Sequence, residues 1–210
     1  MAPKFTVVYF GVRGSADQIK MLLHNAGVDY DSKDFTFEEF AEVKPKTPFG
    51  HLPILKVDDI PYGEATAIMR YLGQKYGVMG ATPEDNYFID ALVDAVKDVA
   101  MSLFKPLFGL KDTEAKKKYL AEKAGEFSKL FEFVDRQMAK CKNGFLVGSK
   151  VTWADFALFS QWNGMRAALG ENVLDGTPNI KKHYETMANY PTMVSFMEKT
   201  KDVPYFPKNF

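Results

Sequence analysis

The sequence predicts a two-part fold in which a small α/β unit precedes an all-helical unit, and three observations support this. Strand and helix patterns alternate over roughly the first eighty residues. The turn-forming segment Gly80-Ala-Thr-Pro83 then interrupts them. Beyond it, apolar residues recur at helical spacing and no convincing strand follows, so the sheet is expected in the first unit alone.

The first unit opens with the apolar run Lys4–Phe10, which predicts a buried strand. A helix is expected over Ser15–Asn25, because its apolar residues share one face and Gly27 provides a C-terminal stop. A strand, a weak helical turn, the two strands of a hairpin and a helix follow, at Val28–Phe35, Glu38–Val43, Ile54–Val57, Ile60–Tyr62 and Ala65–Tyr76. This order requires a mixed sheet with helices on its faces.

Long helices dominate the second unit. The first has an apolar stripe formed by Ile89, Leu92, Val96, Val99 and Leu103. Another is expected over Asp112–Cys141, with further helices starting at Thr152 and near Pro178. Thr152 and Asp155 have the spacing of a capping box, so we interpret Val151–Phe156 as a structural helix start.

The composition argues against several classes of function. The chain has 27 basic and 27 acidic residues, which gives no electrostatic basis for binding nucleic acid or an anionic membrane. Its single cysteine, Cys141, excludes an internal disulfide and a Cys-x-x-Cys redox motif. The three histidines show no metal-ligand spacing, so no metal is expected. Since neither a leader-like segment nor an apolar run of about 18 residues is present, we expect a soluble, intracellular protein.

Tyr9 ends the first predicted strand and is followed by a glycine-bracketed turn, Gly11 to Gly14. A phenol is a poor base at neutral pH but a good hydrogen-bond donor, and donation to a thiolate lowers the pKa of that thiol. Tyr9 is therefore a candidate for activating a bound thiol. The alternative is a strand-end tyrosine that is simply half-buried.

Two further segments have features of a peptide-binding site. Pro53 opens a predicted strand; a cis Leu52–Pro53 bond would expose the Leu52 backbone to a ligand, although trans is the commoner form. Glu64 precedes an apolar helix, where it is suited to bind an ammonium beside an anion held by the helix start. The alternative is that Glu64 only complements the helix dipole.

Asp90, Asp94 and Asp98 recur every four residues on the helix that follows the boundary. This spacing is typical of a solvated helix face, since like charges four residues apart repel slightly. The alternative is a stripe that faces a partner subunit or a ligand.

Taken together, these motifs resemble those of the cytosolic glutathione transferases, most closely the sigma class, which includes glutathione-dependent prostaglandin D synthase. The similarity runs nearly end to end. It rests on Tyr9-Phe10 with Arg13-Gly14, Lys44-Pro-Lys-Thr-Pro-Phe-Gly50, Leu52-Pro-Ile-Leu55, Ala67-Ile-Met-Arg-Tyr-Leu72 and Val151–Phe156.

The resemblance implies a thioredoxin-like, glutathione-binding domain with a mixed four-stranded sheet over residues 1–79. It implies an all-helical domain over residues 84–210 that forms the apolar substrate pocket. It also implies a cytoplasmic homodimer that uses glutathione as co-substrate in detoxification, with no metal, membrane or nucleic acid.

By the same resemblance, Tyr9 stabilises the thiolate and Pro53 is the family's cis-proline. The glutathione-binding positions are Tyr9, Arg13, Phe40, Lys44, His51, Leu52, Pro53, Glu64, Ala65 and Asp98, the last reaching across a dimer. The apolar substrate positions are Phe10, Val12, Ala100, Met101, Phe104, Phe206 and Phe210.

Three departures from the family pattern bear on affinity. Ala65 replaces a serine whose hydroxyl binds the γ-glutamyl carboxylate, Ser15 replaces an arginine, and His51 replaces a lysine or glutamine. Losing a hydrogen bond to a charged group costs about 1.5–3 kcal/mol. We therefore expect weaker glutathione binding than in typical members.

The expected function is conjugation of glutathione to apolar electrophiles, or reduction of organic peroxides. One alternative is a weakly active or non-catalytic binding or structural protein on the same fold, as in the lens crystallins related to this class. The other is a glutathione-dependent prostaglandin isomerase, for which an aromatic residue expected near Lys105 is absent.

Overall fold

A computed structural model of the protein describes residues 3–110 and 112–206. Contacts within the chain divide it into two compact units. The first comprises the residues up to Met79 together with a C-terminal stretch that begins at Tyr190, and the second comprises Gly80–Asn189. The C-terminal stretch therefore belongs structurally to the α/β unit.

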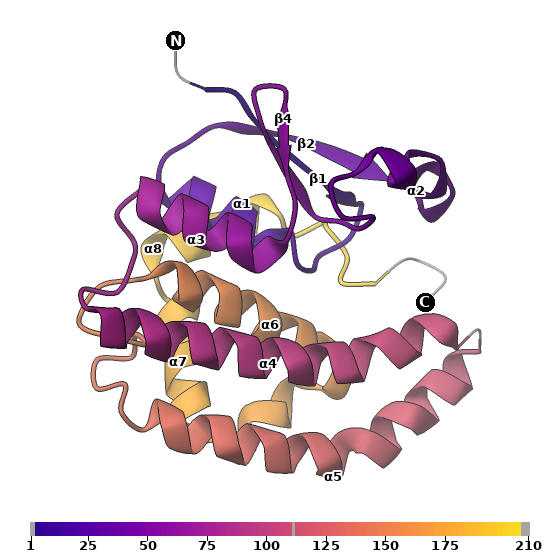
Figure 1. The fold of residues 1–210 in the computed structure, drawn as a ribbon. Helices are drawn as coiled ribbons and strands as arrows, with labels where there is room; N and C mark the ends of the chain where they lie inside the picture. Colours follow the sequence, from indigo (N-terminus) through magenta and orange to yellow (C-terminus); the bar gives the residue numbers. More distant parts are fainter. Residues whose placement is uncertain (1–2, 111, 207–210) are drawn as a thin grey trace. The chain divides into compact units, whose positions relative to one another are not determined.

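The first unit contains the predicted mixed sheet (Figure 1). Its strand order is β2-β1-β3-β4. The central strand β1 (Phe5–Phe10) runs parallel to β2 (Tyr30–Phe35) and antiparallel to β3 (Ile54–Val57). The short edge strand β4 (Ile60–Tyr62) pairs with β3 as a hairpin. These strands confirm the α/β prediction for this unit.

Helix α1 (Asp17–Asn25) packs against α3 (Ala65–Lys75) and against α8 (Pro191–Lys199), as Figure 1 shows. Two hydrogen bonds join α1 to α8: Thr192 donates to Asn25 over 2.8 Å, and the His24 ring pairs with the Ser195 hydroxyl at 2.6 Å. The core is made of fully buried apolar side chains from β1, α1, β3 and α3, among them Val7, Leu22, Leu23, Leu55 and Leu72.

Helix α2 (Phe37–Val43), followed by a short 3₁₀ helix (Lys44–Lys46), is a fuller helix than the weak turn that was expected. Its N-terminus has a complete capping box. The Thr36 hydroxyl accepts from the Glu39 backbone N–H, and the Glu39 carboxylate accepts from the Thr36 N–H. This reciprocal cap satisfies N–H groups at the start of the helix and stabilises it.

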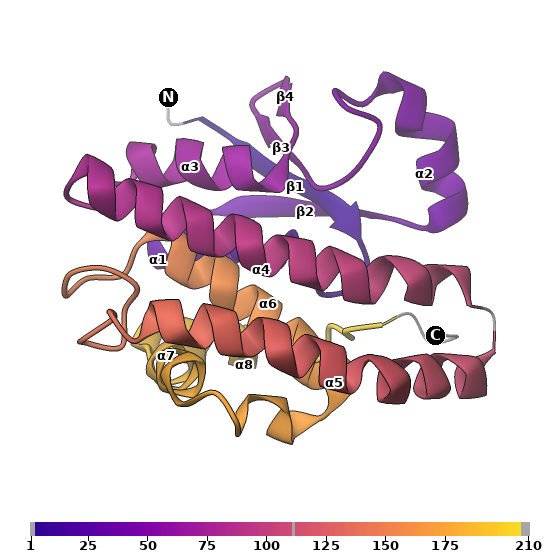
Figure 2. The same cartoon turned by 60° about the horizontal axis from the view of Figure 1, so that its bottom comes forward.

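The second unit is helical, as predicted, and Figure 2 shows its two long helices α4 (Pro83–Gly109) and α5 (Thr113–Met138) side by side. Both contact α6 (Trp153–Leu169), whose first eight residues are all buried. Helix α7 (Pro178–Ala188) contacts α5 and α6, and a short 3₁₀ helix (Glu171–Leu174) precedes it.

The start of α6 confirms the structural interpretation of Thr152 and Asp155. The Thr152 backbone N–H and hydroxyl both donate to the Asp155 carboxylate over 2.7 Å. Asp155 also accepts from the Leu146 N–H at 3.0 Å and pairs with the His183 ring at 3.1 Å. One buried carboxylate therefore joins the start of α6 to the preceding loop and to α7.

Candidate functional site

Tyr9 lies near the end of β1, where its phenol is enclosed by the turn that follows the strand. The phenol oxygen accepts a hydrogen bond from the Ser15 backbone N–H at 3.4 Å. Burial raises the pKa of Tyr9 above its ordinary value of 10.0. The phenol therefore stays protonated at neutral pH, and a phenol that accepts one bond can still donate its own proton to a ligand.

Gly14 is needed because the backbone passes very close to the Tyr9 phenol. A Cβ atom at position 14 would lie 2.7 Å from the phenol oxygen. That is shorter than ordinary van der Waals contact, so any other residue would displace either the turn or the ring. The backbone at Gly14 and Ser15 thus packs closely against the phenol.

Aromatic side chains gather beside Tyr9. The Phe10 ring lies 5.4 Å from that of Tyr9, 4.6 Å from Phe37 and 5.5 Å from Phe40 between centroids. The structure thus brings Phe10, an expected substrate contact, together with Phe40, an expected glutathione contact. Phe37, which the sequence did not single out, is half exposed and extends this apolar surface. Val12 is half-buried in the turn after β1.

A second group of expected site residues lies just before β3 and just after β4, beside the strand that carries Tyr9. The Leu52–Pro53 peptide bond is cis, as the family resemblance implied and against the commoner trans form. Glu64 has a left-handed backbone with φ 66°, a conformation that a non-glycine residue adopts at a cost and that often marks a functional site. It directly precedes Ala65, the first residue of α3.

The structure pairs two of the expected glutathione contacts with each other. The His51 Nε2 and Glu64 Oε1 atoms lie 2.5 Å apart, and both side chains are about half exposed. Lys44 lies in the same stretch of chain, where its carbonyl accepts from the Thr47 backbone N–H and hydroxyl. A ligand ammonium that binds Glu64 therefore competes with His51, which already contacts one oxygen of this carboxylate.

Arg13 is buried, and its donors bind groups within the chain. Its guanidinium pairs with Asp17 at 3.2 Å and donates to the Thr200 carbonyl at 2.6 Å and the Thr200 hydroxyl at 2.9 Å. Its Nε donates to the Val203 carbonyl at 3.2 Å. The structure thus places Arg13 in a polar cluster with the C-terminal residues of the first unit.

Asp17 gives this cluster a pH dependence. Burial raises its pKa from 3.8 to about 6, although the charges of Arg13 and Lys20 lower it. A carboxyl with a raised pKa in the folded state contributes stability below its unfolded pKa and loses that contribution as pH rises through the folded value. A pKa that is about two units higher in the folded than in the unfolded state corresponds to about 3 kcal/mol of folding free energy.

We therefore predict that the stability of the wild type, relative to Asp17→Asn, falls by about 2 kcal/mol between pH 4 and pH 7, the range over which most of this contribution is lost. Denaturant unfolding of both proteins across this range measures the difference, and carboxyl-carbon NMR of Asp17 gives its pKa directly. A stability difference that stays constant across the range contradicts the prediction.

The remaining expected positions lie mostly on α4, in the second unit. Ala100 is buried, Met101 is half exposed, and Phe104 lies against Gly164 of α6. Asp98 is exposed on the same helix. Phe206 is half-buried in the first unit, and Phe210 lies outside the described residues.

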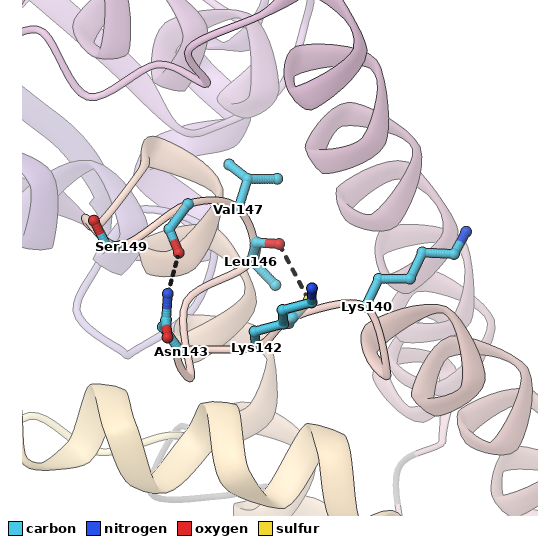
Figure 3. Close-up of a pocket in the computed structure, with 8 residues that line it drawn as sticks. Lys140, Lys142, Asn143, Leu146, Val147 and Ser149 are labelled. Atoms are coloured by element: carbon cyan, nitrogen blue, oxygen red, sulfur yellow. Dashed lines mark hydrogen bonds between the residues drawn. The ribbon is translucent and has the colours of Figure 1, made fainter.

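The loop between α5 and α6 lines an open pocket that contains none of these positions (Figure 3). Within it, Cys141 donates to the Leu146 carbonyl and Asn143 donates to the Gly148 carbonyl. Burial raises the pKa of Cys141 to about 11, so this thiol is protonated and unreactive at neutral pH.

Over residues 3–110 and 112–206, no three or more His, Cys, Asp or Glu side chains are grouped so that they could hold a metal ion. The helices in the same ranges are too short or too polar to cross a membrane.

Comparison with known proteins gives matches to both halves of the chain. Residues 5–74 match the family model "Glutathione S-transferase, N-terminal domain", and residues 97–200 match "Glutathione S-transferase, C-terminal domain". Glutathione S-transferase 1 of Ascaris suum is 31% identical over 97% of this chain and 100% of its own length.

Solved structures are also similar to this chain. The glutathione S-transferase of Ascaris lumbricoides has a TM-score of 0.83 at 29% identity, over 99% of this chain and 100% of that one. Prostaglandin synthase D of Nilaparvata lugens has a TM-score of 0.82 at 27% identity, over 94% and 98% of the two chains.

Proposed function

Because the chain belongs to the glutathione S-transferase family, it is a glutathione transferase with glutathione as co-substrate, and we propose that it acts on apolar electrophiles through a thiolate stabilised by Tyr9. The observation that carries the proposal is the enclosed Tyr9 phenol, whose raised pKa keeps its proton available.

In the proposed reaction, the cysteinyl thiol of glutathione loses its proton to solvent and Tyr9 donates a hydrogen bond to the sulfur anion. A free thiol has a pKa near 8.5, so donation that lowers it by about two units leaves most of the thiol ionised at neutral pH, and a lowering of about one unit already ionises about a quarter of it. The thiolate then attacks the electrophilic carbon, a C–S bond forms, and the leaving group departs with the bonding electrons.

We assign the tripeptide to the first unit, in keeping with a glutathione-binding domain over residues 1–79. The Leu52 backbone binds the cysteinyl part beside Pro53, Glu64 binds the γ-glutamyl ammonium, and the N–H groups at the start of α3 bind its carboxylate. Lys44 and His51 bind the glycyl carboxylate, and Phe40 packs against the tripeptide.

The apolar electrophile is assigned to small and apolar side chains, with residues 84–210 as the main contributor to its pocket. They are Phe10, Val12, Ala100, Met101, Phe104, Phe206 and Phe210. We further propose a cytoplasmic homodimer in which Asp98 reaches the partner's glutathione. Sedimentation as a monomer at micromolar concentration contradicts the dimer.

Ala65→Ser is predicted to tighten glutathione binding about tenfold to a hundredfold, because it supplies a hydroxyl to the γ-glutamyl carboxylate at the start of α3. Isothermal titration calorimetry measures the dissociation constants. Ala121→Ser, at an exposed position on α5, is the matched control and is expected to change nothing. A low-micromolar dissociation constant in the wild type contradicts the expected weak binding.

Conjugation of glutathione to a chromogenic aryl halide tests the proposed function. Turnover at millimolar glutathione is expected, whereas binding without turnover favours the non-catalytic, crystallin-like alternative. An organic hydroperoxide in the same assay tests the peroxidase activity.

The prostaglandin synthase among the structural relatives favours a second candidate, a sigma-class protein with glutathione-dependent isomerase activity. Turnover of a prostaglandin endoperoxide to the D-type product supports this candidate, and the absence of that product at rates where the aryl halide reacts contradicts it.

A further inference from the structure

Residues 200–205, which follow α8, form a short segment that we call the C-terminal strap. Arg13, on the turn after β1, binds the strap at several points. Besides the bonds to the Thr200 carbonyl and hydroxyl and to the Val203 carbonyl, the Arg13 backbone N–H donates to the Pro204 carbonyl over 2.7 Å. The guanidinium also lies 5.2 Å from the centre of the Tyr205 ring.

The other side of the same turn holds Tyr9. Gly14, the residue after Arg13, lies against the phenol oxygen, and the Ser15 N–H donates to it. The Gly14 carbonyl in turn accepts from the Asp17 N–H at 2.9 Å, and the Asp17 carboxylate pairs with Arg13. Three consecutive residues therefore connect the strap to the phenol.

We propose that Arg13 is a positioning residue for Tyr9, and that the C-terminal strap keeps the turn closed around the phenol. The proposal rests on the proposed role of Tyr9 in the transferase reaction. It gives Arg13 a role other than direct contact with glutathione, because all three guanidinium nitrogens donate to groups of the chain: Nη1 to Asp17, and Nε and Nη2 to the strap.

The geometry favours arginine specifically. A planar guanidinium presents five donors in a fixed fork, so one side chain reaches the Asp17 carboxylate and two strap carbonyls at once. An ammonium at the same place keeps the charge beside Asp17 but has only three donors on one nitrogen. Arg13→Lys therefore separates the hold on the strap from the charge pair, and avoids leaving Asp17 buried without a cation.

Arg13→Lys is expected to lower the pKa of Tyr9 toward 10.0, because a looser turn exposes the phenol to water. It is also expected to lower kcat about tenfold with little change in KM, since a catalytic group misplaced by about 1 Å can cost about a hundredfold. The pKa is measured by NMR titration of protein labelled at tyrosine Cζ, with the Tyr9 signal assigned from Tyr9→Phe.

Thr200→Val is the second variant, made in the strap itself. It removes the hydroxyl that accepts from Arg13 and keeps the shape of the side chain. We expect the Tyr9 pKa and kcat to fall, as they do in Arg13→Lys. The changes in the pKa and in log kcat are expected to be about a third as large. If Arg13→Lys does not fold, Thr200→Val decides the proposal alone.

Arg166→Lys is the matched control in the second unit. Arg166 donates to the Glu171 carbonyl at 3.3 Å and lies over the Tyr184 ring at 4.4 Å, so this variant loses contacts of the same kind. It is expected to lower the melting temperature without moving the Tyr9 pKa or kcat. An unchanged Tyr9 pKa in Arg13→Lys overturns the proposal, as does a shift of equal size in the control. A wild type without transferase activity overturns the proposed function instead, and the NMR titration still tests the hold of the strap on Tyr9.

Discussion

Tyr9→Phe is expected to lower kcat for conjugation about tenfold to a hundredfold at neutral pH, with glutathione affinity nearly unchanged. A hydrogen bond to a charged group is worth about 1.5–3 kcal/mol, and this one forms only when the thiol ionises. Its loss raises the pKa of the bound thiol by one to two units, toward 8.5. The pH–rate profile therefore moves to higher pH in the variant, and stopped-flow absorbance of the thiolate measures the same pKa directly.

Tyr30→Phe is the matched control. Tyr30 lies on the neighbouring strand, paired in register with Phe5, where burial and the charge of Asp17 raise its pKa to about 12. It is the same chemical change in the same sheet, but Tyr30 pairs with Phe5 at the start of β1 whereas Tyr9 pairs with Asp34, and no effect on kcat is expected. A Tyr9→Phe protein with the wild-type rate and pH profile would falsify the proposed role of the phenol.

The largest loss of stability is expected for Asp155→Ala, at about 3–5 kcal/mol in the free energy of unfolding. Its carboxylate is fully buried and accepts from Leu146, from the Thr152 N–H and hydroxyl, and from His183. Alanine leaves these donors buried without their acceptor, and each buried group left unsatisfied costs about 1–3 kcal/mol. Urea unfolding followed by circular dichroism measures the loss.

Asp85→Ala provides the control, because Asp85 forms the same kind of capping box with Thr82 at the start of α4, on the exposed surface. A cap in contact with water is worth about 1 kcal/mol. If Asp155→Ala costs no more than Asp85→Ala, the buried network around Asp155 contributes nothing beyond an ordinary cap.

Sequence patterns predicted the elements well wherever the signal is local. The β3–β4 hairpin has the predicted bounds, because two short apolar runs flank the turn residues Asp58 and Asp59. The cap at α6 was predicted for the same reason. Helix α2 was underestimated, because the expected range began at Glu38 and left out Thr36, the residue that caps it.

The site was harder to predict because its key contacts are distant in sequence. The Arg13–Val203 bond joins residues 190 positions apart, and no periodicity or spacing carries that information. The His51–Glu64 pair, in contrast, could have been predicted from the hairpin register. Leu55 lies opposite Tyr62 in the hairpin, so extending that register brings the residues just before β3 close to those just after β4.

The placement of α8 also affects the order in which the two units can fold during synthesis. Ribosomes release the N-terminus first, and domains generally fold as units in that order. In this protein the α/β unit lacks α8, the partner of α1, until Pro191–Lys199 has been translated. The helical unit, Gly80–Asn189, is complete earlier. The segment that holds Tyr9 is therefore synthesised before the helical unit and reaches its final geometry only after that unit has been translated.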